Sequence, residues 1–153
     1  HYLQINSDYI GCVDDTCLAT GELLPVKDTP FDFNKRKRIG QDLEADHIQL
    51  KNAFGYDHSF VLNGTENQLT LEEPVSGRRL IISTTAPVVQ VYTGNFLKDG
   101  CIGKAGRVYE NREGVALETQ LMPNAINTEE NPSTILRKGD KFESNTKYVF
   151  EIM

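Results

Sequence analysis

The sequence predicts an all-β fold, an antiparallel sandwich or barrel with little helix. After Gly55, apolar and polar residues alternate in short segments, with the period of two that a half-buried strand imposes. Turn-forming pairs such as Asn63-Gly64 and Ser76-Gly77 separate these segments. One stretch alone carries a helical period. Many short strands joined by glycine-rich turns are typical of sandwiches and barrels.

Six alternating segments account for the expected strands of the second part of the chain. They lie near residues 58–62, 68–72, 79–83, 88–92, 115–121 and 147–152. Further turn signals between them are Ala86-Pro87, Asp99-Gly100, Glu113-Gly114 and Lys138-Gly139-Asp140. With no repeat and no low-complexity tract, we expect a single domain over residues 1–153.

The first part of the chain is less regular. Residues 1–6 alternate as a strand, residues 11–15 predict a turn, and residues 23–26 form a short apolar patch. Two phenylalanines share one side of the extended segment 30–33, where we expect them to pack rather than bind. Residues 40–54 carry the helical period, with apolar residues three to four positions apart and weak amphipathicity.

Composition excludes two classes of protein. The chain has 153 residues, a formal net charge of −6 and 25% charged residues, and none of its apolar runs approaches the roughly 18 residues of a membrane helix. A nucleic-acid surface needs clustered lysine and arginine, and the only candidate is the basic run at residues 35–38, which we interpret as a solvated loop. We therefore expect neither a membrane span nor a nucleic-acid partner.

Cysteine and histidine are few. The cysteines are Cys12, Cys17 and Cys101, and the histidines are His1, His47 and His58. An odd cysteine count without a dense framework favours a reducing compartment such as the cytoplasm, although a bridge between Cys12 and Cys17 is an alternative. The histidines do not fall at zinc-ligand spacings, and no Cys-x-x-Cys pair is present. We expect neither a metal nor another cofactor.

The stretch 115–121 carries the strongest functional signal. In a strand, Val115, Leu117 and Thr119 point to one face, while Glu118 and Gln120 point to the other. A face that holds a carboxylate and an amide is either plain solvent or the floor of a polar site, and a central strand would favour the site.

A second polar cluster, Gly55-Tyr56-Asp57-His58, stands at the entry to the strand region. Taken alone, Asp57 can be an ordinary strand-entry residue. Polar residues with aromatic neighbours are also the means by which proteins hold sugars, because hydroxyls need hydrogen-bonding partners and ring faces need flat apolar contacts. Gln90 is a third candidate, and it shares a strand face with Val88 and Tyr92.

Six motifs follow one another along the chain: Thr29-Pro30-Phe31-Asp32-Phe33, Gly55-Tyr56-Asp57-His58, Ser76-Gly77-Arg78, Gln90-Val91-Tyr92-Thr93-Gly94-Asn95-Phe96, Leu117-Glu118-Thr119-Gln120 and Pro132-Ser133. In this order they resemble the aldose 1-epimerase, or galactose mutarotase, family. The resemblance covers nearly the whole chain, and the ordered set is far more specific than any single motif.

The resemblance implies that the chain is the C-terminal part of a single aldose 1-epimerase domain. Family members have roughly twice this length, and their two active-site histidines precede the segment that resembles residues 1–5, so His1 is neither of them. The chain also begins without Met and inside an alternating strand, which favours the same interpretation. By the resemblance, we expect part of a large twisted antiparallel sandwich and an N-terminal half of the same protein as partner.

The resemblance also implies an activity and roles for four residues. Such enzymes interconvert the α and β anomers of an aldohexose such as galactose or glucose by opening and reclosing the ring. Glu118 matches the catalytic base, and Asp57 and Gln90 match residues that hold the sugar. His58, beside Asp57, is a further substrate-binding candidate.

Three positions depart from the family's usual pattern. Ala19 stands where proline is common, Asn124 where aspartate is usual, and Asn131 where an aromatic residue is common. None is a proposed base or sugar ligand. The departures affect only the expected sugar preference and local loop shape.

Three other functions stay open at the level of sequence. A glycosidase would also use two carboxylates, for which Asp57 and Glu118 are available. A non-catalytic carbohydrate-binding module would need no proton chemistry. A phosphosugar epimerase of the same superfamily would need a cation near the far end of the sugar, and Arg78, Arg79 and Arg107 are candidates.

Overall fold

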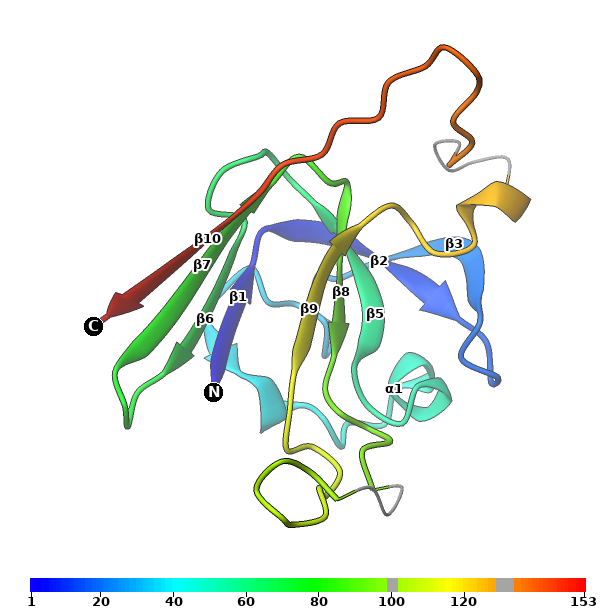
Figure 1. Cartoon of the computed structure of the whole chain (residues 1–153). Coiled ribbons are helices and arrows are strands. Elements are labelled where there is room, and N and C mark those ends of the chain that lie inside the picture. The colour runs from blue at the N-terminus through cyan, green and yellow to red at the C-terminus, as the bar shows by residue number, and fades with distance from the viewer. Residues whose placement is uncertain (99–101, 129–133) are drawn as a thin grey trace.

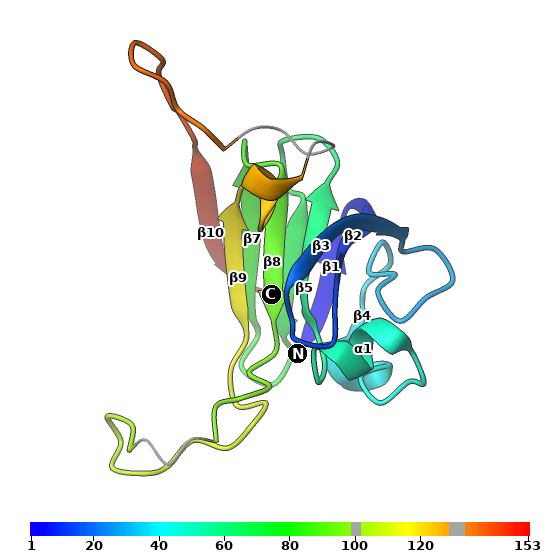
Figure 2. The same ribbon diagram turned by 90° about the vertical axis from the view of Figure 1, so that its right-hand side faces the viewer.

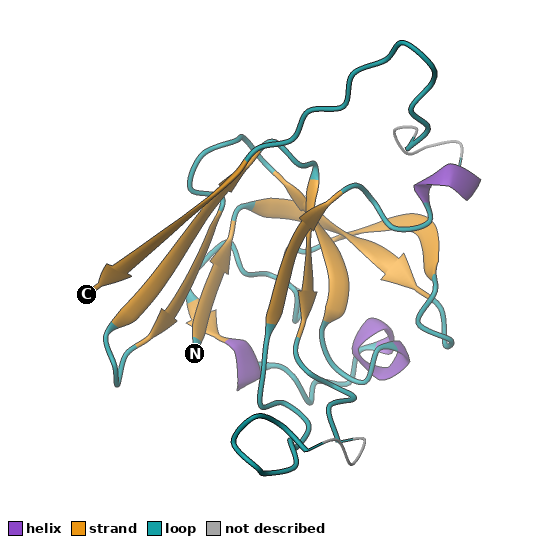
Figure 3. Cartoon of the chain, in the orientation of Figure 1, coloured by secondary structure: helices purple, strands orange, loops and turns teal. Residues whose placement is uncertain are grey.

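The computed structural model describes residues 1–98, 102–128 and 134–153, and they form two antiparallel five-stranded sheets with very little helix (Figures 1 and 3). The first sheet has the order β10-β7-β6-β1-β4 and consists of β1 (Tyr2–Ile5), β4 (Lys37–Arg38), β6 (Leu69–Glu73), β7 (Arg78–Thr84) and β10 (Thr146–Ile152). The second has the order β3-β2-β5-β8-β9 and consists of β2 (Ser7–Val13), β3 (Ala19–Pro25), β5 (Asp57–Leu62), β8 (Val88–Tyr92) and β9 (Ala116–Gln120). The all-β prediction is confirmed.

The core lies between the two sheets. The first sheet contributes Leu3, Ile5, Leu69 and Ile82, and the second contributes Ile10, Phe60, Val89 and Val91; all belong to one buried cluster. Alternation explains this arrangement, because every second residue of a strand points to the same face. The structure is therefore a sandwich rather than a barrel, with antiparallel pairing between all neighbouring strands.

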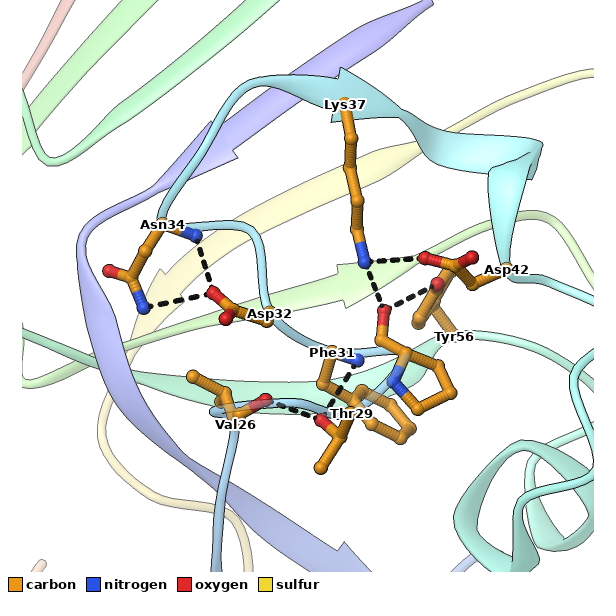
Figure 4. Close-up of polar contacts among 9 residues, drawn as sticks. Val26, Thr29, Phe31, Asp32, Asn34, Lys37, Asp42 and Tyr56 are labelled. Atoms are coloured by element: carbon orange, nitrogen blue, oxygen red, sulfur yellow. Dashed lines mark hydrogen bonds and ion pairs between the residues drawn. The ribbon is translucent and has the colours of Figure 1, made fainter.

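The segment from Val26 to Asn34 fills one end of this core. Phe31 and Phe33 are fully buried, and their rings meet that of Tyr56 edge to face at centroid distances of 5.4 and 5.3 Å. The prediction that these two phenylalanines pack rather than bind is confirmed. The Thr29 hydroxyl donates to the Val26 carbonyl at 2.6 Å and accepts from the Phe31 amide at 3.2 Å (Figure 4), which closes the turn before the aromatic pair.

Lys37 stabilises this segment through polar contacts (Figure 4). Its ammonium donates to the Pro30 carbonyl at 2.7 Å and to Asp42 at 2.8 Å, and it lies 4.4 Å from the centroid of the Phe33 ring. The Tyr56 hydroxyl donates to the same Pro30 carbonyl at 2.9 Å. Lys37, which the sequence analysis assigned to a solvated loop, is thus largely buried and makes structural contacts. The solvated-loop interpretation holds for the exposed Lys35, Arg36 and Arg38, and the side chain of Arg36 is 44% exposed although it pairs with Glu72 at 2.5 Å.

Replacing Lys37 with methionine should therefore lower the free energy of unfolding by about 1–3 kcal/mol, the usual loss when a buried hydrogen-bonding partner is removed. The Met side chain keeps the apolar stem but removes both hydrogen bonds and the charge above Phe33. Urea denaturation of the chain measures the change. Lys35→Met at an exposed position is the control and should change the unfolding free energy by less than about 0.5 kcal/mol.

The helix expected over residues 40–54 is largely wrong. The structure has a 3₁₀ turn, η1 (Ile39–Gln41), and one short helix, α1 (Ile48–Asn52), which His47 caps by accepting the Gln49 amide at 3.2 Å on its Nδ1. A second 3₁₀ turn, η2 (Ala125–Asn127), follows β9. Leu43 and Leu50 pack against the core from an irregular chain, while Phe54 is exposed, so the spacing of these residues resembles a helix without forming one.

The sequence prediction also missed β2 and β3. The register of β2 shifts between Ser7 and Tyr9, where it pairs with β5, and between Gly11 and Val13, where it pairs with β3. Such bulges insert an extra residue and break the alternation that identifies a strand. The turn expected at residues 11–15 begins later, at Asp14, whose carboxylate accepts the Thr16 and Leu18 amides.

Candidate functional site

Three neighbouring strands of the second sheet bring the predicted polar residues together. In this sheet β8 pairs with β5 on one side and with β9 on the other (Figure 1). Ser59 lies directly opposite Gln90, and Gln90 lies directly opposite Glu118. Side chains opposite each other in antiparallel strands share a face. A row of three polar groups therefore crosses the sheet, and Asp57, two residues before Ser59, lies on the same face.

Hydrogen bonds fix the orientation of this row. The Gln90 amide nitrogen donates to Asp57 Oδ1 at 2.7 Å, and the Ser59 hydroxyl donates to Gln90 Oε1 at 2.5 Å. Since one end of the amide accepts and the other donates, Gln90 cannot turn over without losing both contacts. The Asp57 carboxylate is therefore directed along the sheet toward Gln90. Ser59 was missed, although its position two residues after Asp57 could have indicated it.

A shallow cleft of about 450 Å³, largely open to solvent, lies over this face. It is lined by Asp57, Gln90, Tyr92, Phe96, Glu118, Gln120 and Pro123. The volume lies in the range of small-molecule sites, and the lining combines carboxylates, amides and aromatic rings. Sequence reasoning did not name Tyr92, Phe96 or Pro123 as site residues. The strand period already placed Tyr92 on the face of Gln90, whereas Phe96 and Pro123 follow the ends of β8 and β9 and reach the cleft from the connecting segments.

The prediction for the faces of β9 is confirmed. Val115 and Leu117 pack against the core, whereas Glu118 is exposed on the opposite face. Among the described residues, β9 is the outer strand of its sheet rather than a central one. Glu118 is therefore at the open side of the cleft, and Asp57 lies deeper.

Burial raises the pKa of Asp57 above its usual range, and the hydrogen bond from Gln90 opposes this shift in part. A raised folded-state pKa means that the folded chain favours the protonated form. The stability contributed by that preference is lost as the pH rises through the folded pKa. At neutral pH the ionised Asp57 carboxylate thus destabilises the fold, which is common for groups retained for binding.

His58 lies on the opposite face of β5, so the structure does not bring it into the cleft. Its side chain is fully buried, its Nε2 is 3.2 Å from Gln49 Oε1, and its ring meets Phe31 edge to face at 4.7 Å. Burial, with a smaller contribution from His47, lowers the pKa of His58 to about 3. The reason for its position is the strand period itself, because residues 57 and 58 must point to opposite faces.

The connection from β8 to β9 is anchored by Asn95, which sequence reasoning did not single out. Asn95 Oδ1 accepts from Thr93 and from Arg112, each at 2.8 Å, and Nδ2 donates to the carbonyls of Ala53 and Tyr56 at 2.8 and 3.1 Å. Arg112 also donates to the Phe54 carbonyl at 2.8 Å. This buried amide joins the start of β5 to the end of β8, which lie opposite each other, and so supports one end of the cleft. Beyond it, the described part of the connection extends away from the sheets (Figure 2).

Gly55 is required at this anchor. Its φ of 138° is unfavourable for other residues, and an added Cβ would lie 2.3 Å from an Arg112 nitrogen and 2.6 Å from Asn95 Oδ1. Gly55→Ala should therefore lower the free energy of unfolding by about 2–4 kcal/mol through strain and the loss of these hydrogen bonds. Thermal denaturation measures the loss. Gly40→Ala, where an added Cβ meets nothing within 4 Å, is the control and should leave the melting temperature almost unchanged.

The remaining sequence candidates lie elsewhere. Arg78 and Arg79 belong to β7 in the other sheet, and Arg107 pairs with Glu113 at 2.8 Å, so none of the three lines the cleft. Cys12 and Cys17 are free thiols, which excludes the alternative of a bridge between them in this structure. Cys101, Asn131, the turn at residues 99–100 and the motif at residues 132–133 fall outside the described residues. No helix among the described residues is long and apolar enough to cross a membrane.

Comparison with known proteins agrees with the order of the motifs. The sequence profile of aldose 1-epimerase matches residues 1–149. Galactose mutarotases from Sus scrofa and Homo sapiens are each 37% identical over 155 residues, a match that covers 99% of this chain and 44% of each relative. An aldose 1-epimerase from Escherichia coli is 35% identical over 156 residues, covering 98% of this chain and 44% of the relative.

Solved structures show the same relationship. An aldose epimerase homologue from C. elegans has a TM-score of 0.86 at 31% identity, with 99% of this chain and 45% of that chain covered. Galactose 1-epimerase from Lactobacillus acidophilus has a TM-score of 0.75 at 32% identity, with 99% and 43% covered. The chain spans less than half the length of these relatives. The profile match, the sequence identity and the shared fold together show that this chain belongs to the aldose 1-epimerase family.

Proposed function

We propose that this chain carries the base side of an aldose 1-epimerase that interconverts the α and β anomers of an aldohexose such as galactose or glucose. The observation that carries the proposal is the single polar face on which Asp57, Gln90 and Glu118 line one cleft. The names of the relatives, galactose mutarotase and aldose 1-epimerase, favour a sugar as the ligand.

In the proposed reaction, Glu118 accepts the proton of the anomeric hydroxyl. The electron pair of that oxygen–hydrogen bond forms the aldehyde while the bond between the anomeric carbon and the ring oxygen breaks, and an acid protonates the ring oxygen. Rotation about the neighbouring carbon–carbon bond and reclosure by the reverse steps give the other anomer. A carboxylate suits this role because it can take the proton and return it from one position. An exposed carboxylate at the open side of the cleft has the freedom to do both.

Asp57 and Gln90 are proposed to hold the sugar. Gln90 occupies one oxygen of Asp57, and the carboxylate can accept from sugar hydroxyls with its remaining lone pairs. The rings of Tyr92 and Phe96 at the same cleft offer apolar contacts for a pyranose face. The Tyr92 hydroxyl accepts the Phe96 backbone amide at 2.9 Å, which fixes the Tyr92 side chain against the segment that carries Phe96.

We further propose that residues 1–153 are the C-terminal part of one aldose 1-epimerase domain, and that the acid comes from an N-terminal half of the same protein. Along β10, Tyr148 and Phe150 lie opposite Ile82 and Leu80 of β7, so they continue the core face of the first sheet, yet Phe150 is 78% exposed. An apolar strip that extends a core face is suited to packing against further strands of the same domain.

Polarimetry tests this function. We define the assembled protein as this chain together with the N-terminal half. In practice, that half is the part of a galactose mutarotase that precedes the segment similar to this chain. Freshly dissolved α-galactose should lose its excess optical rotation much faster with the assembled protein than with the chain alone. An assembled, folded protein that leaves the spontaneous rate unchanged would contradict the proposal. Release of phenol from an aryl glycoside would instead favour a glycosidase.

A further inference from the structure

His58 stands directly behind Asp57, on the core side of β5. The Asp57 backbone amide donates to His58 Nδ1 at 3.1 Å, and His58 Nε2 lies 3.2 Å from Gln49 Oε1. A nitrogen that accepts a hydrogen bond carries no proton, so the proton of this neutral ring is on Nε2, where it is donated to Gln49. The two contacts thus determine a single tautomer.

Gln49 is itself held at both ends of its amide. Its Oε1 accepts the Val13 amide at 2.8 Å, and its Nε2 donates to the Val13 carbonyl at 3.1 Å. The imidazole is packed edge to face against Phe31 at a centroid distance of 4.7 Å, and the His47 ring also meets Phe31 edge to face, at 5.3 Å. The chain of contacts therefore runs from β2, through α1, to the backbone of Asp57, and every side chain in it has a fixed partner.

The Asp57 amide needs such a partner. β5 pairs with β2 through residues Phe60 to Leu62. Asp57, at the start of β5, therefore lies beyond the end of that ladder. A half-buried amide at the end of a strand must find an acceptor outside the sheet or lose stability. The neighbouring imidazole supplies the acceptor from within the core.

We propose that His58 is a positioning residue for sugar binding: through Nδ1 it holds the Asp57 backbone so that the carboxylate points at Gln90 and into the cleft. This inference rests on the proposed function, since it assumes that Asp57 holds the sugar. Contrary to the expectation from sequence, His58 thus does not contact the substrate. It acts on sugar binding through Asp57, from the opposite face of the strand. The strongly lowered pKa of His58 agrees with a ring that stays neutral while it accepts the Asp57 amide.

Two substitutions separate the two ends of the imidazole. His58→Asn places an amide oxygen at the position of Nδ1 and can still accept the Asp57 amide, but it loses the contact with Gln49. His58→Gln places an amide nitrogen near the position of Nε2 and can still donate to Gln49, but it loses the acceptor for Asp57. Both remove the ring from the core, so both should lower the melting temperature by similar amounts.

The readouts are the KM and kcat of the assembled protein for galactose, the dissociation constant for galactose by calorimetry, and the hydrogen-exchange rate of the Asp57 amide by NMR. His58→Gln should raise KM and the dissociation constant about tenfold with kcat nearly unchanged, and should speed exchange of the Asp57 amide at least tenfold. His58→Asn should keep KM, the dissociation constant and the exchange rate of the Asp57 amide close to those of the unsubstituted protein. In an Asp57→Asn background, His58→Gln should weaken galactose binding little further, because the two substitutions act through one contact.

Equal effects of His58→Asn and His58→Gln on galactose affinity and on Asp57 exchange would overturn the inference and leave His58 a core residue only. The inference would also be overturned if His58→Gln weakened galactose binding as much in the Asp57→Asn background as it does alone. If the unsubstituted assembled protein binds galactose without interconverting its anomers, the proposed function fails. The affinity and exchange comparisons still decide the role of His58.

Discussion

Replacing Glu118 with glutamine in the assembled protein is expected to slow anomer interconversion by about 100- to 10,000-fold, the usual contribution of a general base. The substitution keeps the shape of the side chain and its place opposite Gln90, but it removes the group that accepts the anomeric proton. KM for galactose should change little, because the side chain is exposed at the open side of the cleft and is not proposed to hold the sugar. Polarimetry with α-galactose and α-glucose measures both quantities.

A matched control for this substitution is Glu66→Gln, which changes the same charge at an exposed position in the turn between β5 and β6. Its rate should equal that of the unsubstituted protein. A Glu118→Gln protein with a near-normal rate would show that another group removes the proton. The assignment of the base to β9 would then be wrong.

Asp57→Asn is expected to reduce kcat/KM by about 10- to 150-fold, because a hydrogen bond to a charged group contributes roughly 1.5–3 kcal/mol. Asparagine can still accept from Gln90, so the row across the sheet should survive. The loss should fall mainly on KM, since Asp57 is proposed to bind rather than to move a proton. Initial rates over a range of galactose concentrations separate the two parameters.

Stability provides an independent check on Asp57. Because burial raises the pKa of its carboxylate, the ionised form destabilises the fold at neutral pH, and Asp57→Asn should not lower the free energy of unfolding. Asp15→Asn, at an exposed turn, is the control and should change neither stability nor kinetics. Unchanged kinetics in Asp57→Asn would reduce Asp57 to a strand-entry residue, the alternative that the sequence left open.

The parts of the fold that sequence could predict are those whose residues alternate without interruption. The strand at residues 88–92 was predicted with its observed bounds, and the faces of β9 followed from the spacing of Leu117 and Glu118. In β2, by contrast, two shifts of register break the alternation, and the strand was missed. The expected helix failed for a related reason, because apolar residues on an irregular chain can repeat every three or four positions.

The candidate site was predictable by residue but not by geometry. Asp57, Gln90 and Glu118 came from local patterns and from the family resemblance, and each is on a different strand. Whether they meet depends on the register of β5, β8 and β9, which is set by long-range pairing that a single sequence does not contain. For His58 the local pattern was the better guide, because the strand period places it on the face opposite to Asp57. The family resemblance nevertheless made His58 a substrate-binding candidate.

The structure of the assembled protein with galactose tests the central claim most directly. The account predicts a pyranose in the cleft over β5, β8 and β9, with its anomeric hydroxyl within about 3.2 Å of a Glu118 carboxylate oxygen and other hydroxyls bound to Asp57 and Gln90. A galactose bound outside this cleft, or one whose anomeric hydroxyl lies beyond reach of Glu118, would contradict it.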